Sequence, residues 1–157
     1  MSDTNNSALA KSVYDTLCET LDKRDWKYEK HIEDLVITFT ASGNDLPMNF
    51  VLKIDEDRQL IRLFSFLPFE VNEDKRMEMA IATCAATYGL PDGSFDYDIT
   101  KGRISFRLTA TFRESKIGEA LFDYLVVCSG VIVDQYNDKF FALSKGYMSL
   151  EDFLKDA

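Results

Sequence analysis

The segment from Leu60 to Phe69, LIRLFSFLPF, constrains the fold more than any other stretch of this chain. Successive side chains of a strand point to opposite faces, and here both alternating sets are apolar, with Arg62 and Ser65 as the polar interruptions. A strand that is apolar on both faces has to be covered on both. The cover comes either from other elements of the same chain or from another polypeptide, and the sequence leaves both alternatives open.

Apolar residues at a period of two predict three strands before this segment. They are separated by turn-forming stretches at Glu33-Asp34, at Ser42 to Pro47 and at Asp55 to Arg58, and the last of these leads into a fourth strand, Gln59 to Leu67. The apolar positions of the three strands are Trp26 and Tyr28, then Leu35, Ile37 and Phe39, then Phe50, Leu52 and Ile54. The sequence therefore predicts a meander of four antiparallel strands.

One helix is predicted before this meander and another after it. Apolar residues recur every four positions from Ser7 to Lys23, with Asn6 or Ser7 as the N-cap. Asn72 is the expected N-cap of the second helix, which Gly89 and Pro91 end. The apolar pattern of that second helix runs through Met77, Ile81, Cys84 and Tyr88.

A hairpin follows, in the run FDYDITKGRISFR from Phe95 to Arg107. A two-residue loop at Lys101-Gly102 would place Tyr97 opposite Phe106 on an apolar face. The same register would place Asp96 opposite Arg107 on the polar face, in an ion pair worth at most about 1 kcal/mol.

A third long helix is expected from Ser115 to Phe141. Gly130 lies in its interior and predicts a bend or a close backbone contact. Near the C-terminus, Ser149 followed by Asp152 resembles a capping box that opens a last helical turn through Leu154. The resulting order is α-β-β-β-β-α-β-β-α, an α+β fold in which helices cover an antiparallel sheet.

Composition indicates one globular domain over residues 1–157. Hydrophobic residues make up 46% of the chain and aromatic residues 13%, which is ample apolar area for a core. No linker or repeat divides the chain. Cys18, Cys84 and Cys128 are odd in number and lie in apolar, helix-like surroundings, where we expect free, buried thiols.

Charge and motifs disfavour several classes of function. A net charge of −9 provides no basic surface for nucleic acid or anionic membranes, and the N-terminus has no signal-like segment, which predicts a cytoplasmic protein. His31 is the single histidine, so neither a nucleophile–histidine pair nor a two-histidine metal site is expected. Phosphate-binding glycine loops are absent, and the DED run at Asp55 to Asp57 lacks the glycine of a calcium loop. We therefore expect no enzymatic activity, metal or cofactor.

The run from Phe95 to Arg107, with the preceding ATYGLPDG, resembles the signature of YbjN-domain proteins, a bacterial family. The likeness extends over nearly the full chain and includes the closing KGYMSLEDFL, Lys145 to Leu154. It implies a fold similar to that of class I type III secretion chaperones. It also implies a sensory or regulatory role, without a reaction that could be transferred to this chain.

Two hypotheses about function follow. The first is a chaperone-like or regulatory module that binds another protein, a peptide or a second copy of itself through the apolar strand, at Leu60, Leu63, Phe64 or Phe66. The second is a small-molecule-binding regulator, with a pocket between the sheet and the long C-terminal helix lined by Tyr124, Tyr136 and Phe140.

Overall fold

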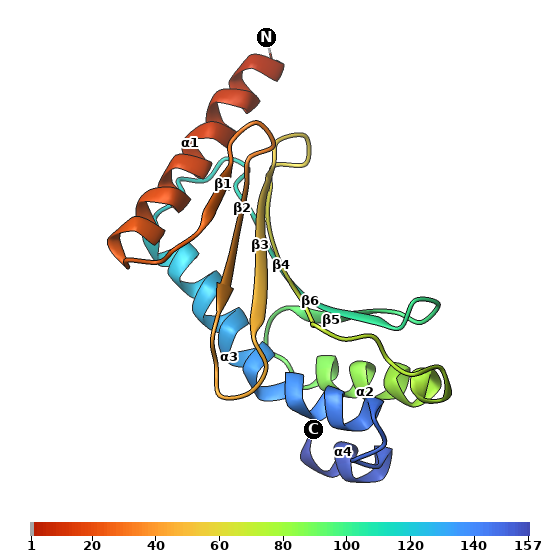
Figure 1. Cartoon of the computed structure of the whole chain (residues 1–157). Helices are drawn as coiled ribbons and strands as arrows, with labels where there is room; N and C mark the ends of the chain where they lie inside the picture. Colours follow the sequence, from red (N-terminus) through yellow and green to blue (C-terminus); the bar gives the residue numbers. More distant parts are fainter. Residues whose placement is uncertain (1) are drawn as a thin grey trace.

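A six-stranded antiparallel sheet forms the centre of the structure, a computed structural model that describes residues 2–157 (Figure 1). The strands lie in the order β1-β2-β3-β4-β6-β5, so the C-terminal hairpin joins the meander through a β4–β6 pair. The predicted α+β class is confirmed. The strands are β1 (Glu29–His31), β2 (Val36–Ala41), β3 (Met48–Asp55), β4 (Leu60–Phe66), β5 (Ser94–Asp98) and β6 (Arg103–Thr111).

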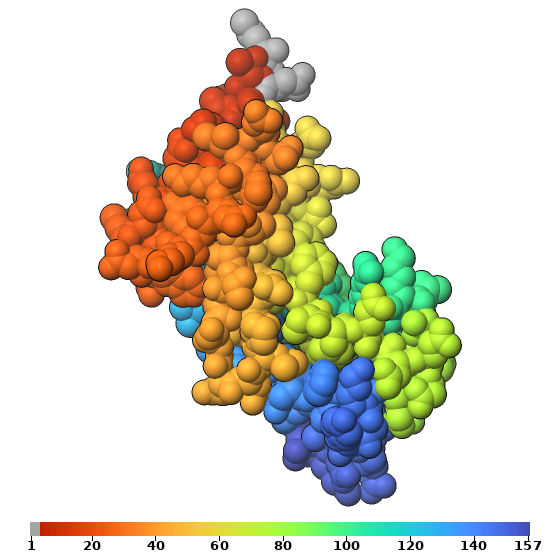
Figure 2. Space-filling model, in the orientation of Figure 1, coloured from red at the N-terminus to blue at the C-terminus, as the bar shows by residue number. Residues whose placement is uncertain are grey.

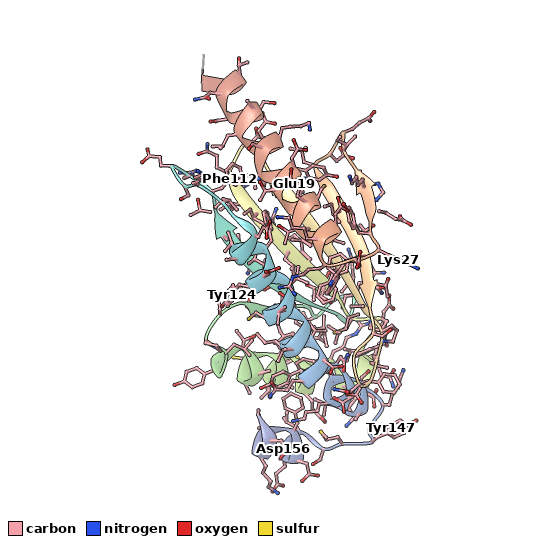
Figure 3. The ribbon with its side chains drawn as sticks, turned by 90° about the vertical axis from the view of Figure 1, so that its left-hand side faces the viewer. Glu19, Lys27, Phe112, Tyr124, Tyr147 and Asp156 are labelled. Atoms are coloured by element: carbon pink, nitrogen blue, oxygen red, sulfur yellow. The ribbon has the colours of Figure 1, made fainter. Side chains whose placement is uncertain are left out.

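Helices cover one face of this sheet. The two long helices, α1 (Ser2–Lys23) and α3 (Glu119–Ser144), lie in front of the strands when the molecule is seen from that side (Figure 3). Helix α2 (Arg76–Tyr88) packs against β5 and α3, and the short helix α4 (Leu150–Asp156) packs against α2 and α3 (Figure 1). Within residues 2–157, no helix lies over the opposite face of the sheet (Figure 1).

The core lies between the sheet and the helices. Four strands contribute one buried residue each to a row that runs across the sheet, and every member of the row is at most 1% exposed. The row is Ile37, Leu52, Leu63 and Leu108, each opposite the next in the strand register. The period-two pattern of the sequence therefore identified the face of the meander that the helices cover.

The start of α1 and the position of β1 differ from the prediction. Helix α1 begins at Ser2, and Asn6 lies inside it, where its Oδ1 accepts a hydrogen bond at 3.0 Å from Nε2 of Gln59. Neither Asn6 nor Ser7 is the N-cap, because both lie inside α1. The strand predicted around Trp26 is only three residues long and follows it, while the Trp26 ring packs edgewise on Phe39 at 5.2 Å between centroids.

The C-terminal hairpin forms with a register two residues away from the predicted one. Tyr97 lies opposite Ile104, and Asp96 lies opposite Ser105. The loop is four residues long because the carboxylate of Asp98 accepts hydrogen bonds from the backbone N–H groups of Thr100 and Lys101. A shift of two residues keeps the side chains within the two strands on their predicted faces, since the strand period is also two, whereas Ile99 falls in the loop and is 41% exposed.

Helix α2 is not capped by Asn72 as predicted. The side chain of Asn72 makes no capping hydrogen bond, and the chain enters α2 through a 3₁₀ turn at Glu73–Lys75. The Asn72 side chain instead accepts a hydrogen bond from Nζ of Lys145, and its backbone N–H donates to Oγ of Ser144. Asn72 therefore ties the start of α2 to the end of α3.

Helix α3 runs from Glu119 to Ser144 and includes Gly130 without interruption. It begins after the predicted start at Ser115. A β-carbon built at Gly130 would meet no other part of the protein within 4 Å. The close backbone contact predicted at this glycine is therefore wrong.

Replacing Gly130 by alanine is expected to raise the free energy of unfolding by about 0.5 to 1 kcal/mol, because alanine loses less backbone entropy inside a helix. Urea melts of the two proteins measure the difference. A loss of stability of the same size would show that the position needs glycine after all.

The C-terminal helix is capped as predicted. Oγ of Ser149 accepts a hydrogen bond at 3.1 Å from the backbone N–H of Asp152, which is the expected cap of α4. Phe153 is 1% exposed, and its ring stacks on Phe140 at 5.3 Å between centroids. The last helix is therefore anchored to α3 through an aromatic contact.

Candidate functional site

Strand β4 has one covered face and one open face. Ile61, Leu63 and Ser65 point toward the helices and are fully buried. Leu63 is therefore a core residue and cannot contact a partner, contrary to the prediction. The open face carries the other candidates, and Phe66 is 51% exposed on it. Leu60, Arg62 and Phe64 are half-buried there.

We call Val51, Leu60, Phe64 and Phe66 the open-face patch. The register places Phe64 between Val51 of β3 and Arg107 of β6. The rings of Phe64 and Phe66 stack along the strand with 6.1 Å between their centroids. None of the helices that the structure describes covers these side chains, so they form an apolar surface in the middle of the sheet.

Cationic side chains flank the open-face patch. The guanidinium of Arg62 lies 5.0 Å from the ring centroid of Phe64, within cation–π range. Nε of Arg107 donates a hydrogen bond to Asp96 at 2.7 Å, so the predicted ion pair of the hairpin forms across a diagonal of the register. Lys53 lies opposite Arg62 on β3. The open face thus combines one exposed and one half-buried aromatic ring with hydrogen-bond donors.

Asp55, at the end of β3, holds Arg62 in place and also binds Arg58 of the β3–β4 turn. Burial alone would raise the pKa of Asp55, but backbone and side-chain hydrogen bonds from Arg58 and the charge of Arg62 outweigh it and keep the pKa below its usual value. The carboxylate is therefore ionised at neutral pH. It restrains Arg62 beside the Phe64 ring.

The shape of the molecule leaves the open face accessible. Figure 2 shows a hollow between the β3–β4 turn and the β5–β6 turn, on the side away from α1 and α3. The sheet itself forms the floor of this hollow, and the hollow is wide and shallow. Such a surface suits a chain laid across the strands better than a small molecule, which needs a cavity that encloses most of its area.

The three residues predicted to line a small-molecule pocket are not together in one cavity. Phe140 is fully buried and Tyr136 is 5% exposed, and both pack on Phe95, at 5.0 Å and 5.4 Å between ring centroids. Tyr124 lies on the outside of α3 (Figure 3), where its hydroxyl donates to Asp92. Its hydrogen bonds with Asp92 and Cys128 raise the pKa of Tyr124 to about 12. Tyr136 and Phe140 are therefore part of the core.

Metal-binding and nucleophilic groups are dispersed. Within residues 2–157 the structure holds no group of three or more histidine, cysteine or acidic side chains that could bind a metal ion. Cys18 is buried, Cys128 is half-buried and Cys84 is exposed, so the prediction of a buried thiol is wrong for Cys84. His31 is exposed on β1.

A second apolar surface lies on α2, and sequence reasoning assigned it to the wrong environment. The pattern that predicted this helix is its exposed face: Met77 is 70% exposed, Ile81 51% and Tyr88 94%. Cys84 is exposed between them. We call Met77, Ile81, Cys84 and Tyr88 the α2 stripe. The residues of α2 that pack into the core are Met79, Ala82, Thr83 and Ala86.

The α2 stripe borders a shallow groove of about 660 Å³ whose other wall is α4. Ala80 and Ala85 form part of its floor, and Leu154 and Ala157 line the α4 side. Leu154 is 42% exposed. The apolar surface therefore continues from α2 onto its neighbour.

Across the part of the chain that the structure describes, none of the helices is long and apolar enough to cross a membrane.

Neither a protein-family model nor a curated protein matches the sequence. Three solved structures resemble the fold. A chain of the HopA1–SchA chaperone–effector complex aligns with a TM-score of 0.60 and 12% identity, over 82% of this chain and 95% of that one. YbjN from E. coli aligns with a TM-score of 0.58 and 12% identity, over 80% of this chain and 92% of that one. A chain of the ExsC–ExsE complex aligns with a TM-score of 0.56 and 11% identity, over 81% of this chain and 92% of that one. The predicted YbjN-like, type III secretion chaperone-like fold is confirmed.

Proposed function

We propose that this chain, with its chaperone-like fold, is a non-enzymatic, cytoplasmic module that binds a segment of another polypeptide on the open face of its sheet. The observation that carries the proposal is the open-face patch, an uncovered set of apolar side chains at the centre of the sheet. Exposed aromatic residues within an apolar patch are typical of protein-binding surfaces. Two of the structural neighbours are chains of protein complexes, one of them a chaperone–effector complex, which supports the same class of function.

The chemistry of the open face favours an extended polypeptide as the partner. Phe64 and Phe66 offer apolar contact to side chains, while Arg62, Arg107 and Lys53 offer donors to backbone carbonyl groups or carboxylates. A nucleic acid would meet the field of a chain with net charge −9. A small molecule would remain largely exposed to solvent in a hollow this wide and shallow.

Replacing Phe64 and Phe66 together by serine is expected to weaken partner binding by about tenfold or more, because aromatic anchors contribute most of the affinity of such surfaces. The protein is purified gently from its own cytoplasm, and native mass spectrometry measures the fraction that carries another polypeptide. Thermal melting shows that the variant is folded.

Two single variants control for the loss of any exposed apolar side chain. Ile32 is 54% exposed and Tyr147 is 80% exposed, and neither belongs to the open-face patch. Ile32→Ser and Tyr147→Ser should retain the co-purifying polypeptide. Equal retention by the double variant and these controls would exclude the open face as the binding surface.

A further inference from the structure

The charges on the four central strands, β2, β3, β4 and β6, are opposite in sign to the charge of the whole chain. The chain has 27 acidic and 18 basic residues, whereas these strands carry one acidic residue, Asp55, and four basic ones. The register places all four basic residues on the open face: Lys53, Arg62, Arg103 and Arg107. The open face is therefore a cationic region on an acidic protein.

Two of the four basic side chains already have an acidic partner. Nη2 of Arg103 lies 3.1 Å from Glu70, and Nε of Arg107 lies 2.7 Å from Asp96. Both pairs involve β6. Because each of these charges is neutralised by its neighbour, the excess positive charge of the open face lies on β3 and β4.

The other two basic residues, Lys53 and Arg62, lie directly opposite each other on β3 and β4. Opposite residues of antiparallel strands have Cβ atoms roughly 5 Å apart, and like charges at that position destabilise a sheet. The carboxylate of Asp55 is 7% exposed and lies 3.2 Å from Arg58 but 3.7 Å from Arg62. Among the described residues, Lys53 forms no ion pair and Arg62 donates no hydrogen bond. The pair therefore holds unused positive charge and unused donors in the centre of the sheet.

We propose that Lys53 and Arg62 bind an acidic side chain of the partner, so that the open face selects a polypeptide segment with a carboxylate next to apolar residues. The inference rests on the proposed function and deepens it, because it names the chemical class of the segment. A carboxylate between the two side chains removes the repulsion between them and accepts hydrogen bonds from both.

Arg62 is held ready for this contact. Its guanidinium lies 5.0 Å from the ring centroid of Phe64 and within ion-pair distance of Asp55, while 33% of the side chain stays exposed. A side chain that is already restrained loses little conformational entropy when it binds. Val51 and Phe64 are the next open-face residues after Lys53 and Arg62, about 7 Å along the strands. Apolar neighbours of the bound acidic residue therefore reach the open-face patch.

Acidic residues at both edges of the sheet limit the negative charge that the partner can carry. Glu29 is exposed on β1, and Asp98 is exposed on β5. Each edge lies two strands, roughly 10 Å, from the Lys53–Arg62 pair. The Debye length is about 8 Å at physiological ionic strength, so the nearest charges dominate at each place. This arrangement attracts one acidic residue at the centre and repels a long polyanion such as a nucleic acid at the edges.

A phage-displayed library of random dodecapeptides, selected on the immobilised full chain, tests the proposal. We expect the selected peptides to be enriched in Asp or Glu beside aromatic or aliphatic residues. Replacing that Glu by Gln, or Asp by Asn, in a selected peptide should weaken binding by about tenfold or more, the effect of losing hydrogen bonds between charged groups. Fluorescence anisotropy of the labelled peptides measures the loss.

Lys53→Glu separates binding from folding. The new carboxylate lies opposite Arg62, so the variant should melt about 2 °C higher than the wild type, while it binds the acidic peptides about tenfold or more weakly. Lys116→Glu is the matched control, because Lys116 is exposed in the loop before α3 and the change in charge is the same. It should bind the peptides as the wild type does.

Three results would overturn the inference: selected peptides without enrichment in acidic residues, acidic peptides that bind Lys53→Glu as tightly as the wild type, or a labelled single-stranded oligonucleotide that displaces the peptides. The double variant Phe64→Ser, Phe66→Ser tells its failure apart from failure of the proposed function. Peptides without an acidic preference that this variant no longer binds would refute the inference alone. Peptides that it binds as tightly as the wild type would refute both proposals.

Discussion

Replacing Phe106 by alanine is expected to lower the free energy of unfolding by about 3 to 5 kcal/mol. Phe106 is fully buried on β6, and its ring packs edgewise on Phe95 at 5.3 Å between centroids. The backbone of Gly93 also lies against this ring, because a β-carbon at Gly93 would be 2.4 Å from Cζ of Phe106. Surroundings packed this closely on several sides cannot collapse into the space that the ring leaves. Guanidinium melts measure the loss.

Asp96→Ala in the same hairpin is the control. Its carboxylate pairs with Arg107, and both side chains are more than 40% exposed, so the pair should contribute less than about 1 kcal/mol. Similar losses for the two variants would contradict the assignment of faces in this hairpin.

Replacing Phe140 by alanine is expected to cost about 3 to 5 kcal/mol as well. The ring is fully buried and contacts three other rings, with centroid distances of 5.0 Å to Phe95, 5.3 Å to Phe153 and 5.8 Å to Tyr136. Its loss removes the contact that anchors α4 on α3. Denaturant melts should therefore show a large destabilisation, and hydrogen exchange should show faster opening of α4 than of α1.

Tyr124→Phe is the control for this prediction, because Tyr124 is 46% exposed and the variant loses only the surface hydrogen bonds of its hydroxyl with Asp92 and Cys128. Its cost should be below about 1 kcal/mol. A Phe140→Ala protein of nearly wild-type stability would contradict the core assignment, and the pocket interpretation of Tyr136 and Phe140 would regain support.

The strands of the meander were predictable because the period-two pattern has a physical cause that this fold obeys. One face of each strand packs on helices and the other meets solvent, so apolar and polar residues alternate, as in Phe50, Leu52 and Ile54. The hairpin faces were predictable for the same reason. Its register was not, because the hydrogen bonds of Asp98 lengthen the loop and an even shift leaves the alternation unchanged.

The faces of α2 were not predictable from periodicity. A helical pattern of apolar residues identifies a helix but does not say which face the protein covers. Here small residues, Ala82 and Ala86, allow α2 to lie close to the core, while Met77 and Tyr88 point to solvent. Between Arg76 and Asp92 the chain has a single charged residue, Glu78, although 29% of its residues are charged, and this was the available signal that the exposed face of α2 is unusually apolar.

The apolar character of the candidate site on β4 was predictable from the sequence, but the face of the strand that carries the site was not. The apolar character of both faces indicated that both need a cover, from this chain or from another, and within residues 2–157 the open-face patch is the part of β4 that the helices leave accessible. The sequence could not separate Leu63 from Phe64, because the choice of face depends on where α3 packs.

One measurement tests the central claim, that the open face binds another polypeptide, most directly. A photo-crosslinking phenylalanine analogue is placed at Phe66 or, as the control, at Ile32, two positions of similar exposure, in the cells that produce the protein. We expect irradiation to join another polypeptide to the chain at position 66 and not at position 32. Products of equal abundance at both positions, or none at position 66, would contradict the account.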